Sequence, residues 1–240
     1  MSIRIGTSGW HYRHWTGRFY PPGMDSDDWL AFYADAFDCV EINNSFYRLP
    51  TTETIDQWLA RTPPEFVFTL KASRYITHMK KLHDCASPLA ALLPLARRFG
   101  DRLAAVLFQL PPRWHVNQAR LAEFLAILPP DLRYAVEFRD PSWHVESVYA
   151  LLRDHGVAFC QYDLGGQRSP PVTTSDLVYL RLHGPRQAYA GSYAEGEIRA
   201  WAKQLRAWDA QGDDVYVFFD NDQDACAVQD ARALREQVTG

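Results

Sequence analysis

Long apolar runs are missing from this sequence, and so are paired cysteines. No hydrophobic stretch approaches the roughly 18 residues that a membrane-spanning helix needs. The first residues enter a β-rich run at once, without the apolar region of a secretory signal peptide. The 4 cysteines lie far apart and form no Cys-x-x-Cys pair, so a disulfide framework is not expected. These absences predict a reduced, cytoplasmic protein without a membrane partner.

An excess of positive charge is also missing. The chain has 25 Lys and Arg against 29 Asp and Glu, a formal net charge of −4. A protein that grips a polyanion over a broad face usually shows the opposite balance. The basic run at residues 71–83 is interpreted first as a solvated loop and helix face. Nucleic acid is therefore an alternative partner and not the favoured one.

Common cofactor motifs are absent as well. The chain has no Walker loop, no Gly-x-Gly-x-x-Gly and no His-Glu-x-x-His, and GTSGW at 6–10 is not a nucleophile elbow. The acidic run at 220–224 opens like a calcium loop, but Ala225 and Ala231 stand where Gly and Glu are required. No cofactor and no metal site are predicted; a single divalent ion is the open alternative.

What the sequence does contain is a regular alternation of β-rich and helical segments. Apolar β-rich runs are expected at 3–7, 39–44, 66–71, 103–110, 133–138, 157–163, 177–183 and 215–219. Helical spacing is found at 27–37, 52–60, 89–99, 118–128, 147–154, 195–210 and 225–238. The sixth connection, 164–176, is short and rich in Gly and Pro, which predicts a short or irregular sixth helix. Eight such units in 240 residues predict one domain, 1–240, folded as a single (β/α)8 TIM-like barrel.

The ends of the expected strands are polar. In a barrel, side chains alternate between the interior and the layer that faces the helices. That alternation turns these residues inward: Glu41, Asn43, Lys71, Gln109, Glu137, Arg139, Gln161, Asp163, Tyr179, Arg181 and His183. For residues 220–222 the alternation does not decide which side chain turns inward. Because barrel enzymes carry their active sites at this end of the strands, a polar site at the C-terminal mouth is expected.

These strand ends also carry a pattern of short motifs that spans the chain. The motifs are GTSGW (6–10), VEIN (40–43), SFYR (45–48), KASR (71–74), TH (77–78), QLPP (109–112), VEFR (136–139), SW (142–143), RLHG (181–184), YAGSY (189–193) and FDND (219–222). As a set they resemble the family called domain of unknown function 72, or YecE-like. The last motif often has Asn where this chain has Asp220. The resemblance implies a TIM-like barrel and no established activity, and a relation to barrel endonucleases that act at abasic sites has been suggested for the family.

The charges at the strand ends lead to a first hypothesis of function. We expect a metal-independent enzyme that acts on a small anionic, sugar-like or phosphorylated substrate. The expected catalytic residues are Glu41, Lys71, Glu137 and His183, with a Glu as base and His183 as proton shuttle. The expected substrate-binding residues are Trp10, Asn43, Gln109, Arg139, Trp143, Asp163, Arg181, Gly191, Ser192, Tyr193 and Asn221. SYAE at 192–195 predicts a capping box, which would place Gly191 and Ser192 at a helix N-terminus suited to phosphate.

Two other classes of function stay open. One is a nucleic-acid-binding protein or phosphodiesterase that resembles barrel endonucleases, and the other is a barrel that binds a ligand without catalysis. A multinuclear zinc site is disfavoured because Lys71 and Arg181 share the ring with the carboxylates. A retaining glycosidase is disfavoured because Glu41 and Glu137 come from nearly opposite strands. Arg181 itself has two candidate roles, as a ligand-binding residue or as an internal counter-ion of Glu41 or Glu137. No oligomeric state is predicted.

Overall fold

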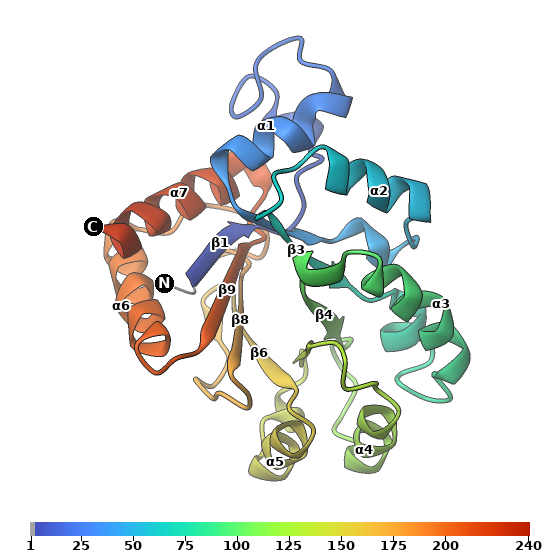
Figure 1. The fold of residues 1–240 in the computed structure, drawn as a ribbon. Helices are drawn as coiled ribbons and strands as arrows, with labels where there is room; N and C mark the ends of the chain where they lie inside the picture. The colour runs from blue at the N-terminus through green and yellow to red at the C-terminus, as the bar shows by residue number, and fades with distance from the viewer. Residues whose placement is uncertain (1–2) are drawn as a thin grey trace.

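Eight parallel strands form the centre of the molecule in the computed structural model, which describes residues 3–240 (Figure 1). They are β1 (Ile3–Thr7), β2 (Cys39–Ile42), β3 (Val67–Lys71), β4 (Leu103–Gln109), β5 (Tyr134–Glu137), β6 (Ala158–Leu164), β8 (Leu177–Leu182) and β9 (Asp214–Phe219). The strands follow the order β1-β9-β8-β6-β5-β4-β3-β2. The two ends of this path meet in a parallel bridge between Ser8 and Glu41, where the Gly9 N–H donates to the Glu41 carbonyl at 2.8 Å. The sheet thus closes on itself, and the predicted TIM-like barrel is confirmed.

Seven helices surround the strands, as Figure 1 shows for the described residues. They are α1 (Trp29–Ala36), α2 (Thr52–Ala60), α3 (Ala86–Arg97), α4 (Gln118–Ala126), α5 (Glu146–Asp154), α6 (Glu195–Asp209) and α7 (Cys226–Thr239). Short helical turns lie in the connections: η1 (Arg13–Trp15), η2 (Ser26–Asp28), η3 (Asn44–Phe46), η4 (Tyr75–Met79), η5 (Gly100–Arg102), η6 (Pro141–Trp143) and η7 (Gln223–Ala225). Five of them, η1, η3, η4, η6 and η7, follow the C-terminal ends of β1, β2, β3, β5 and β9.

The predicted irregular sixth connection contains no helix in this structure. Between β6 and β8 the chain forms only the two-residue strand β7 (Gln167–Arg168), which pairs antiparallel with the end of β6. Gly165 and Gly166 make the tight turn with positive φ angles of 61° and 85°, a conformation that glycine adopts at little cost. The outer face of β6 therefore packs against α5 and lies beside this segment, whose Arg168 lies over the ring of Trp201 in α6.

The barrel has two apolar layers on the two faces of its strands. The inner layer is built from small side chains, such as Ala105 and Ala135, together with the aromatic rings of Tyr179 and Phe218. The outer layer lies between strands and helices and holds most of the large aliphatic and aromatic side chains, including Phe108 and Val217. Burying a side chain of this size contributes about 1.5–3 kcal/mol. The periodicity of two that separates these layers is also what sends polar residues at the strand ends into the barrel.

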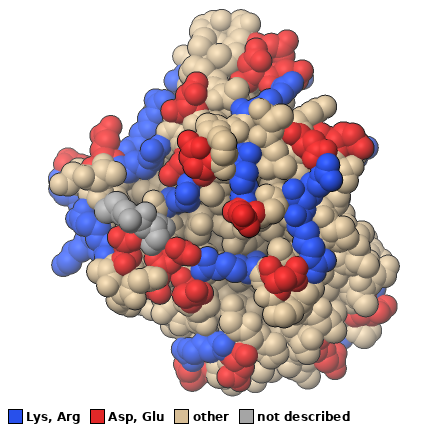
Figure 2. All heavy atoms as spheres, in the orientation of Figure 1, with Lys and Arg blue, Asp and Glu red and all other residues tan. Residues whose placement is uncertain are grey.

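Charged groups are arranged differently at the two ends of the strands. Near the strand starts they are partly exposed, as in the pair of Arg4 and Asp38 at 3.6 Å. On the face that Figure 2 shows, basic and acidic residues alternate without a large area of one sign. At the strand ends, by contrast, Glu41, Glu137 and Arg181 are fully buried. Within residues 3–240, every helix is too short or too polar to cross a bilayer.

Candidate functional site

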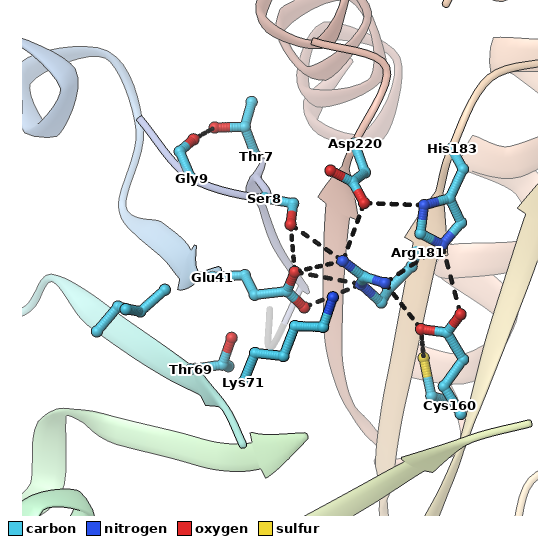
Figure 3. A network of polar contacts seen from close by, with 12 residues as sticks. Thr7, Ser8, Gly9, Glu41, Thr69, Lys71, Cys160, Arg181, His183 and Asp220 are labelled. Carbon is cyan, nitrogen blue, oxygen red and sulfur yellow. Dashed lines mark hydrogen bonds and ion pairs between the residues drawn. The ribbon is translucent and has the colours of Figure 1, made fainter. Parts of the chain in front are cut away.

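Arg181 lies at the centre of a cluster of polar side chains at the C-terminal mouth of the barrel (Figure 3). It points inward from β8 and is 0% exposed. Its Nη2 donates to Glu41 Oε1 at 2.7 Å and to Asp220 Oδ2 at 3.0 Å, and its Nη1 donates to Glu137 Oε2 at 2.8 Å. Its Nε donates to Glu41 Oε2 at 3.0 Å, which completes a two-pronged contact. One guanidinium therefore joins carboxylates from β2, β5 and the end of β9.

The carboxylates of this cluster have further partners. Tyr179, two residues before Arg181 on β8, donates its hydroxyl to Glu41 Oε2 at 2.6 Å. The Ser8 hydroxyl also donates to Glu41, and Arg139 forms an ion pair with Glu137. Each of these two buried carboxylates is thus paired with cationic or hydroxyl donors.

Nearby charges set the ionisation of Glu137 and Asp220. Burial opposes the charged form of Glu137, but Arg139 and Arg181 outweigh it and lower the pKa of this carboxyl well below its usual range. For Asp220 burial is likewise outweighed, by Arg181 and His183, and the pKa is lowered. Neither carboxyl carries the raised pKa of a general acid.

His183 lies between Asp220 on its Nδ1 side and two guanidinium groups on its Nε2 side, where Glu137 Oε1 is also 3.6 Å away. Its Nε2 faces Arg139 Nη2 at 2.9 Å and Arg181 Nη1 at 3.4 Å, and guanidinium groups only donate. Nε2 must therefore accept, so we assign the ring proton to Nδ1, which lies 2.9 Å from Asp220 Oδ2. This tautomer is neutral. With His183 neutral, Arg139 and Arg181 face the three carboxylates Glu41, Glu137 and Asp220, and Lys71 brings the cluster to charge balance.

Lys71 differs from the two arginines because no carboxylate contacts it. Its Nζ has no hydrogen-bond or ion-pair partner within residues 3–240; it lies 4.5 Å from the centre of the Phe46 ring, in η3. Burial and then the charge of Arg181 lower the pKa of Lys71 to about 8, although Glu41, Asp220 and Glu137 act in the opposite direction. The amine is thus close to its titration range at neutral pH.

A positive region adjoins the balanced cluster on the side of β3. His78 packs edge-on against Phe46 with ring centres 5.0 Å apart. Burial and then the charges of Lys71, Arg74 and Arg139 lower the pKa of His78 to about 4. Its imidazole is therefore neutral at pH 7. The cations that act on His78 come from β3, from the turn after β3 and from the end of β5, so positive charge accumulates here.

Comparison with known proteins identifies the family. Residues 4–240 match the family described as "Protein of unknown function DUF72". The chain belongs to this family. The UPF0759 protein YunF of Bacillus subtilis is 26% identical over 271 residues, which cover 98% of this chain and 94% of YunF. The UPF0759 protein YecE of Escherichia coli K12 is 33% identical over 150 residues, 59% of this chain and 50% of YecE.

Solved structures of the family have the same fold. A DUF72 family protein from Thermotoga maritima superposes with a TM-score of 0.83 at 27% identity, with 99% of both chains covered. A second one, from Enterococcus faecalis, gives a TM-score of 0.78 at 18% identity over 99% of this chain and 96% of that one, a likeness of fold alone. The printed names state no activity.

Two residues of this DUF72 barrel that were expected to point inward, Gln161 and the expected site residue Asp163, point outward instead. The inward positions of β6 are Cys160 and Tyr162, so the prediction that Gln161 and Asp163 point inward is wrong. Asp163 instead pairs with Arg168 at 3.1 Å and accepts from the Gly166 N–H at 3.1 Å. The alternation misled because the helix-free crossover presents polar groups to the outer face of β6. An outward carboxylate there is satisfied by the loop and needs no apolar partner.

Four more expected residues, Trp143, Gly191, Tyr193 and Asn221, belong to the helix layer or its loops. Trp143 is 0% exposed, stacks on Phe138 and donates its indole N–H to the Trp114 carbonyl at 2.6 Å. Asn221 donates to the Gly191 carbonyl and to Asp230 of α7, both at 2.7 Å. The Tyr193 N–H donates to the same Asp230 at 3.1 Å. Asn221 and the backbone of Gly191 and Tyr193 thus fasten the end of β9 to α7 and to the loop before α6, whereas Trp143 packs between the segments that follow β4 and β5. No hydrogen bond joins any of the four to Arg181 among the described residues.

The helix N-terminus expected to bind phosphate is occupied by acidic groups. The predicted capping box at 192–195 is wrong: α6 begins at Glu195, and the Glu197 carboxylate accepts from the Ala194 N–H at 2.8 Å. Ser192 lies outside the helix and is exposed. The favourable end of the helix dipole is thus already used by Glu195 and Glu197.

The remaining expected residues do lie at the mouth. Trp10 and Asn43 line a cavity of about 210 Å³ with Gly9, His11, Tyr12, Asn44 and Tyr47. The Tyr12 phenol donates to the Ser8 carbonyl at 2.6 Å, which places this cavity beside the cluster. Gln109 is buried at the end of β4 and donates to the carbonyl of Leu110 at 2.7 Å.

The sequence pattern did not assign three residues of the site: Ser8, Asp220 and Phe46. Ser8 lies two positions after the inward Gly6, so the alternation along β1 was a usable signal. Asp220 follows the inward Tyr216 and Phe218 in the same way and is the acid that turns into the cluster. Phe46 lies in a helical turn, and no periodicity in the sequence places its ring under Lys71.

A metal site is not formed by these side chains. Among residues 3–240, no three His, Cys, Asp or Glu side chains come together in an arrangement that would hold an ion. The acidic oxygens at the mouth are directed at Arg139 and Arg181 instead. The 4 cysteines are free thiols.

Proposed function

We propose that this DUF72 barrel is an enzyme that binds a small anionic, sugar-like or phosphorylated substrate at its C-terminal mouth without a metal ion. The observation that carries the proposal is the positive region formed by Lys71, Arg74 and Arg139 around the neutral His78. Lys71 has no acidic partner within residues 3–240, and Arg74, three residues further along the chain, is exposed. An anion would pair with the exposed Arg74 and with Lys71, whose Nζ has no carboxylate partner within residues 3–240, at modest desolvation cost because Lys71 is already buried.

The charge-balanced cluster around Arg181 orients the side chains next to this site. Arg181 is saturated by Glu41, Glu137 and Asp220, so we revise its role from binding ligand to holding the three carboxylates. Those carboxylates in turn orient Arg139 and the Nδ1–H tautomer of His183. Such fixed charges stabilise a developing charge without reorganising, which is the main way in which enzymes use electrostatics. Glu41, Glu137 and His183 therefore act through position, and Lys71 is the group that faces the substrate.

Thermal denaturation with inorganic phosphate tests the proposal. At a hundred times the dissociation constant a ligand adds about 2.7 kcal/mol, or roughly 5–10 °C in a protein of this size. We expect Arg74→Gln and Lys71→Met to lose most of this gain. Lys203→Gln, an exposed change on α6, should keep it. Protection should also weaken as the pH rises through about 8, because Lys71 then loses its charge.

Equal protection of the parent, Arg74→Gln and Lys71→Met would overturn the assignment, and so would no protection by phosphate, sulfate or sugar phosphates.

The same denaturation experiment with a single-stranded oligonucleotide tests the second candidate function. Tyr47 and Tyr75 are exposed beside two cavities of about 510 and 480 Å³ that share Leu49. Exposed aromatic and basic groups favour bound bases as the second candidate. Protection by the oligonucleotide alone, falling steeply with salt, would assign nucleic acid as the ligand.

A further inference from the structure

We propose that Lys71 is a nucleophile that forms an iminium bond with the carbonyl carbon of a small anionic aldehyde or ketone. This inference rests on the proposed function and names the substrate class for the same site. The chain has 4 lysines, at positions 71, 80, 81 and 203, and Lys71 is the buried one, with 7% of its surface exposed.

The surroundings of Lys71 differ from those of a lysine that only balances charge. A structural counter-ion contacts a carboxylate, as Arg139 contacts Glu137 and Arg181 contacts Glu41. Lys71 has no such contact within residues 3–240, and its Nζ lies over the face of the Phe46 ring, a cation–π contact that holds the nitrogen in place without a hydrogen-bond acceptor. In Figure 3 the side chain reaches from the end of β3 toward Arg181. Its nitrogen is thus held in place while it is left free of an acceptor that would hold its proton.

The same surroundings favour the unprotonated amine. Desolvation and a neighbouring cation are the two effects that activate lysine nucleophiles in enzymes. Both act on Lys71, where burial and then Arg181 lower the pKa to about 8. At pH 7 this leaves about one amine in ten unprotonated, against a few in ten thousand for an unperturbed lysine.

The reaction balances without an oxidant or a cofactor. The Lys71 nitrogen attacks the carbonyl carbon, the new N–C bond forms, and the C=O π bond breaks as its oxygen takes the proton that leaves nitrogen. A second proton, from solvent at the open side of the mouth, lets the hydroxyl leave as water. The product is an iminium ion with the single positive charge that the ammonium had. The nearby Glu41, Glu137 and Asp220 therefore stabilise the iminium ion as they stabilise the ammonium ion.

The anionic part of such a substrate has a place beside Lys71. Arg74 is exposed three residues after Lys71, and like Lys71 and Arg139 it contributes to the positive potential at His78. A carboxylate or phosphate bound there would bring an adjacent carbonyl within the reach of Nζ. This arrangement selects for carbonyl compounds that carry a negative charge over neutral ones.

Reductive trapping tests the inference. The parent protein is incubated with glyoxylate, pyruvate or dihydroxyacetone phosphate and sodium borohydride, and each lysine is then quantified by peptide mass spectrometry. We expect at least one probe to label Lys71 at least tenfold faster than the exposed Lys81 and Lys203, with a rate that rises as the pH increases toward about 8. Acetone, a neutral carbonyl, should label Lys71 no faster than Lys203. Lys71→Arg, checked for folding by its melting curve, should lose the adduct at this position.

Each outcome bears on one of the two proposals. Labelling of Lys71 no faster than that of Lys81 and Lys203 with all three probes would overturn the nucleophile. If phosphate protection still depended on Lys71 in that case, the anion site would stand with Lys71 as a plain cation. Selective trapping by acetone as well as by the anionic probes would overturn the anionic substrate class.

Discussion

Arg181 shows how far a single side chain organises this site. Its guanidinium makes contacts in three directions within one plane, to Glu41, Glu137 and Asp220. A lysine at this position would bring the same charge on one nitrogen and could not reach all three acids at once. Each carboxylate that loses its donor would be left charged in a region from which water is excluded.

For this reason we expect Arg181→Lys to act on stability and not on anion binding. Breaking a buried ion pair costs about 3–5 kcal/mol, which corresponds to a fall in melting temperature of roughly 6–20 °C for a chain of this length. Phosphate should still raise the melting temperature of the variant by as much as that of the parent. Differential scanning calorimetry with and without phosphate measures both effects.

The matched control is Arg199→Lys, in an exposed pair with Glu195 on α6. A shift of less than about 0.5 kcal/mol is expected there. An Arg181→Lys variant with an unchanged melting temperature and no phosphate response would return Arg181 to the ligand-binding residues.

At the scale of elements, the loop between β8 and α6 depends on Gly184. This residue has a φ of 113°, and a Cβ there would overlap the carbonyl oxygens of Gln187 and Ala190. It directly follows His183, whose carbonyl accepts from the Tyr189 N–H at 2.5 Å. The loop thus fixes the backbone that carries His183 into the cluster.

Gly184→Ala should therefore destabilise the protein by about 3 kcal/mol, since backbone strain and steric overlap add. Gly191→Ala is the control within the same loop. Its φ is 75°, but nothing lies near the position of a Cβ, so a cost of about 1 kcal/mol is expected. Urea denaturation of the two variants gives the comparison, and equal losses would contradict the role of Gly184.

The sixth crossover explains why the sequence pattern gave the wrong inward-facing side chains for β6. Along β6, Cys160 and Tyr162 alternate with Gln161 and Asp163, and either set is acceptable inside a barrel with a polar mouth. An amphipathic helix in the next segment would have shown which set faces outward. The chain has a Gly- and Pro-rich loop there instead, whose Arg168 and backbone N–H groups satisfy Asp163.

At the scale of the whole molecule, the buried charges link the stability of the barrel to pH. The first strand pairs with the last and meets the second through Ser8 and Glu41. The two residues that join β1 to β2, Ser8 and Glu41, therefore also belong to the cluster around Arg181. The pKa of Glu137 and that of Asp220 are lowered in the folded state. A group with a lowered folded pKa stabilises the fold above its unfolded pKa, and this contribution is lost as the pH falls toward the folded pKa.

We expect the free energy of unfolding in urea to be steady near pH 7 and to fall below about pH 5, by several kcal/mol at pH 3. High salt should change this loss little, because the cluster is shielded from solvent. The whole chain should unfold in one transition. A free energy that stays flat down to pH 3 would show that these carboxylates are already protonated or are not paired in solution.

The sequence by itself determined the barrel and most of its mouth. The alternation of β-rich and helical segments is a local signal, and the period of two along each strand correctly turned Glu41, Lys71, Glu137, Arg181 and His183 inward. These features depend on neighbours a few residues apart, so they can be read along the chain.

Only the tertiary structure decided how those side chains pair. Arg181 meets Glu41, Glu137 and Asp220, which lie 140, 44 and 39 positions away in the chain, and no local pattern encodes which acids an arginine reaches. The same holds for the Phe46 ring beneath Lys71, and for Trp143 and Asn221, whose polar atoms bind loops and α7. Burial gives these contacts their effect, because a charge removed from water depends on whichever partner the closed barrel brings to it.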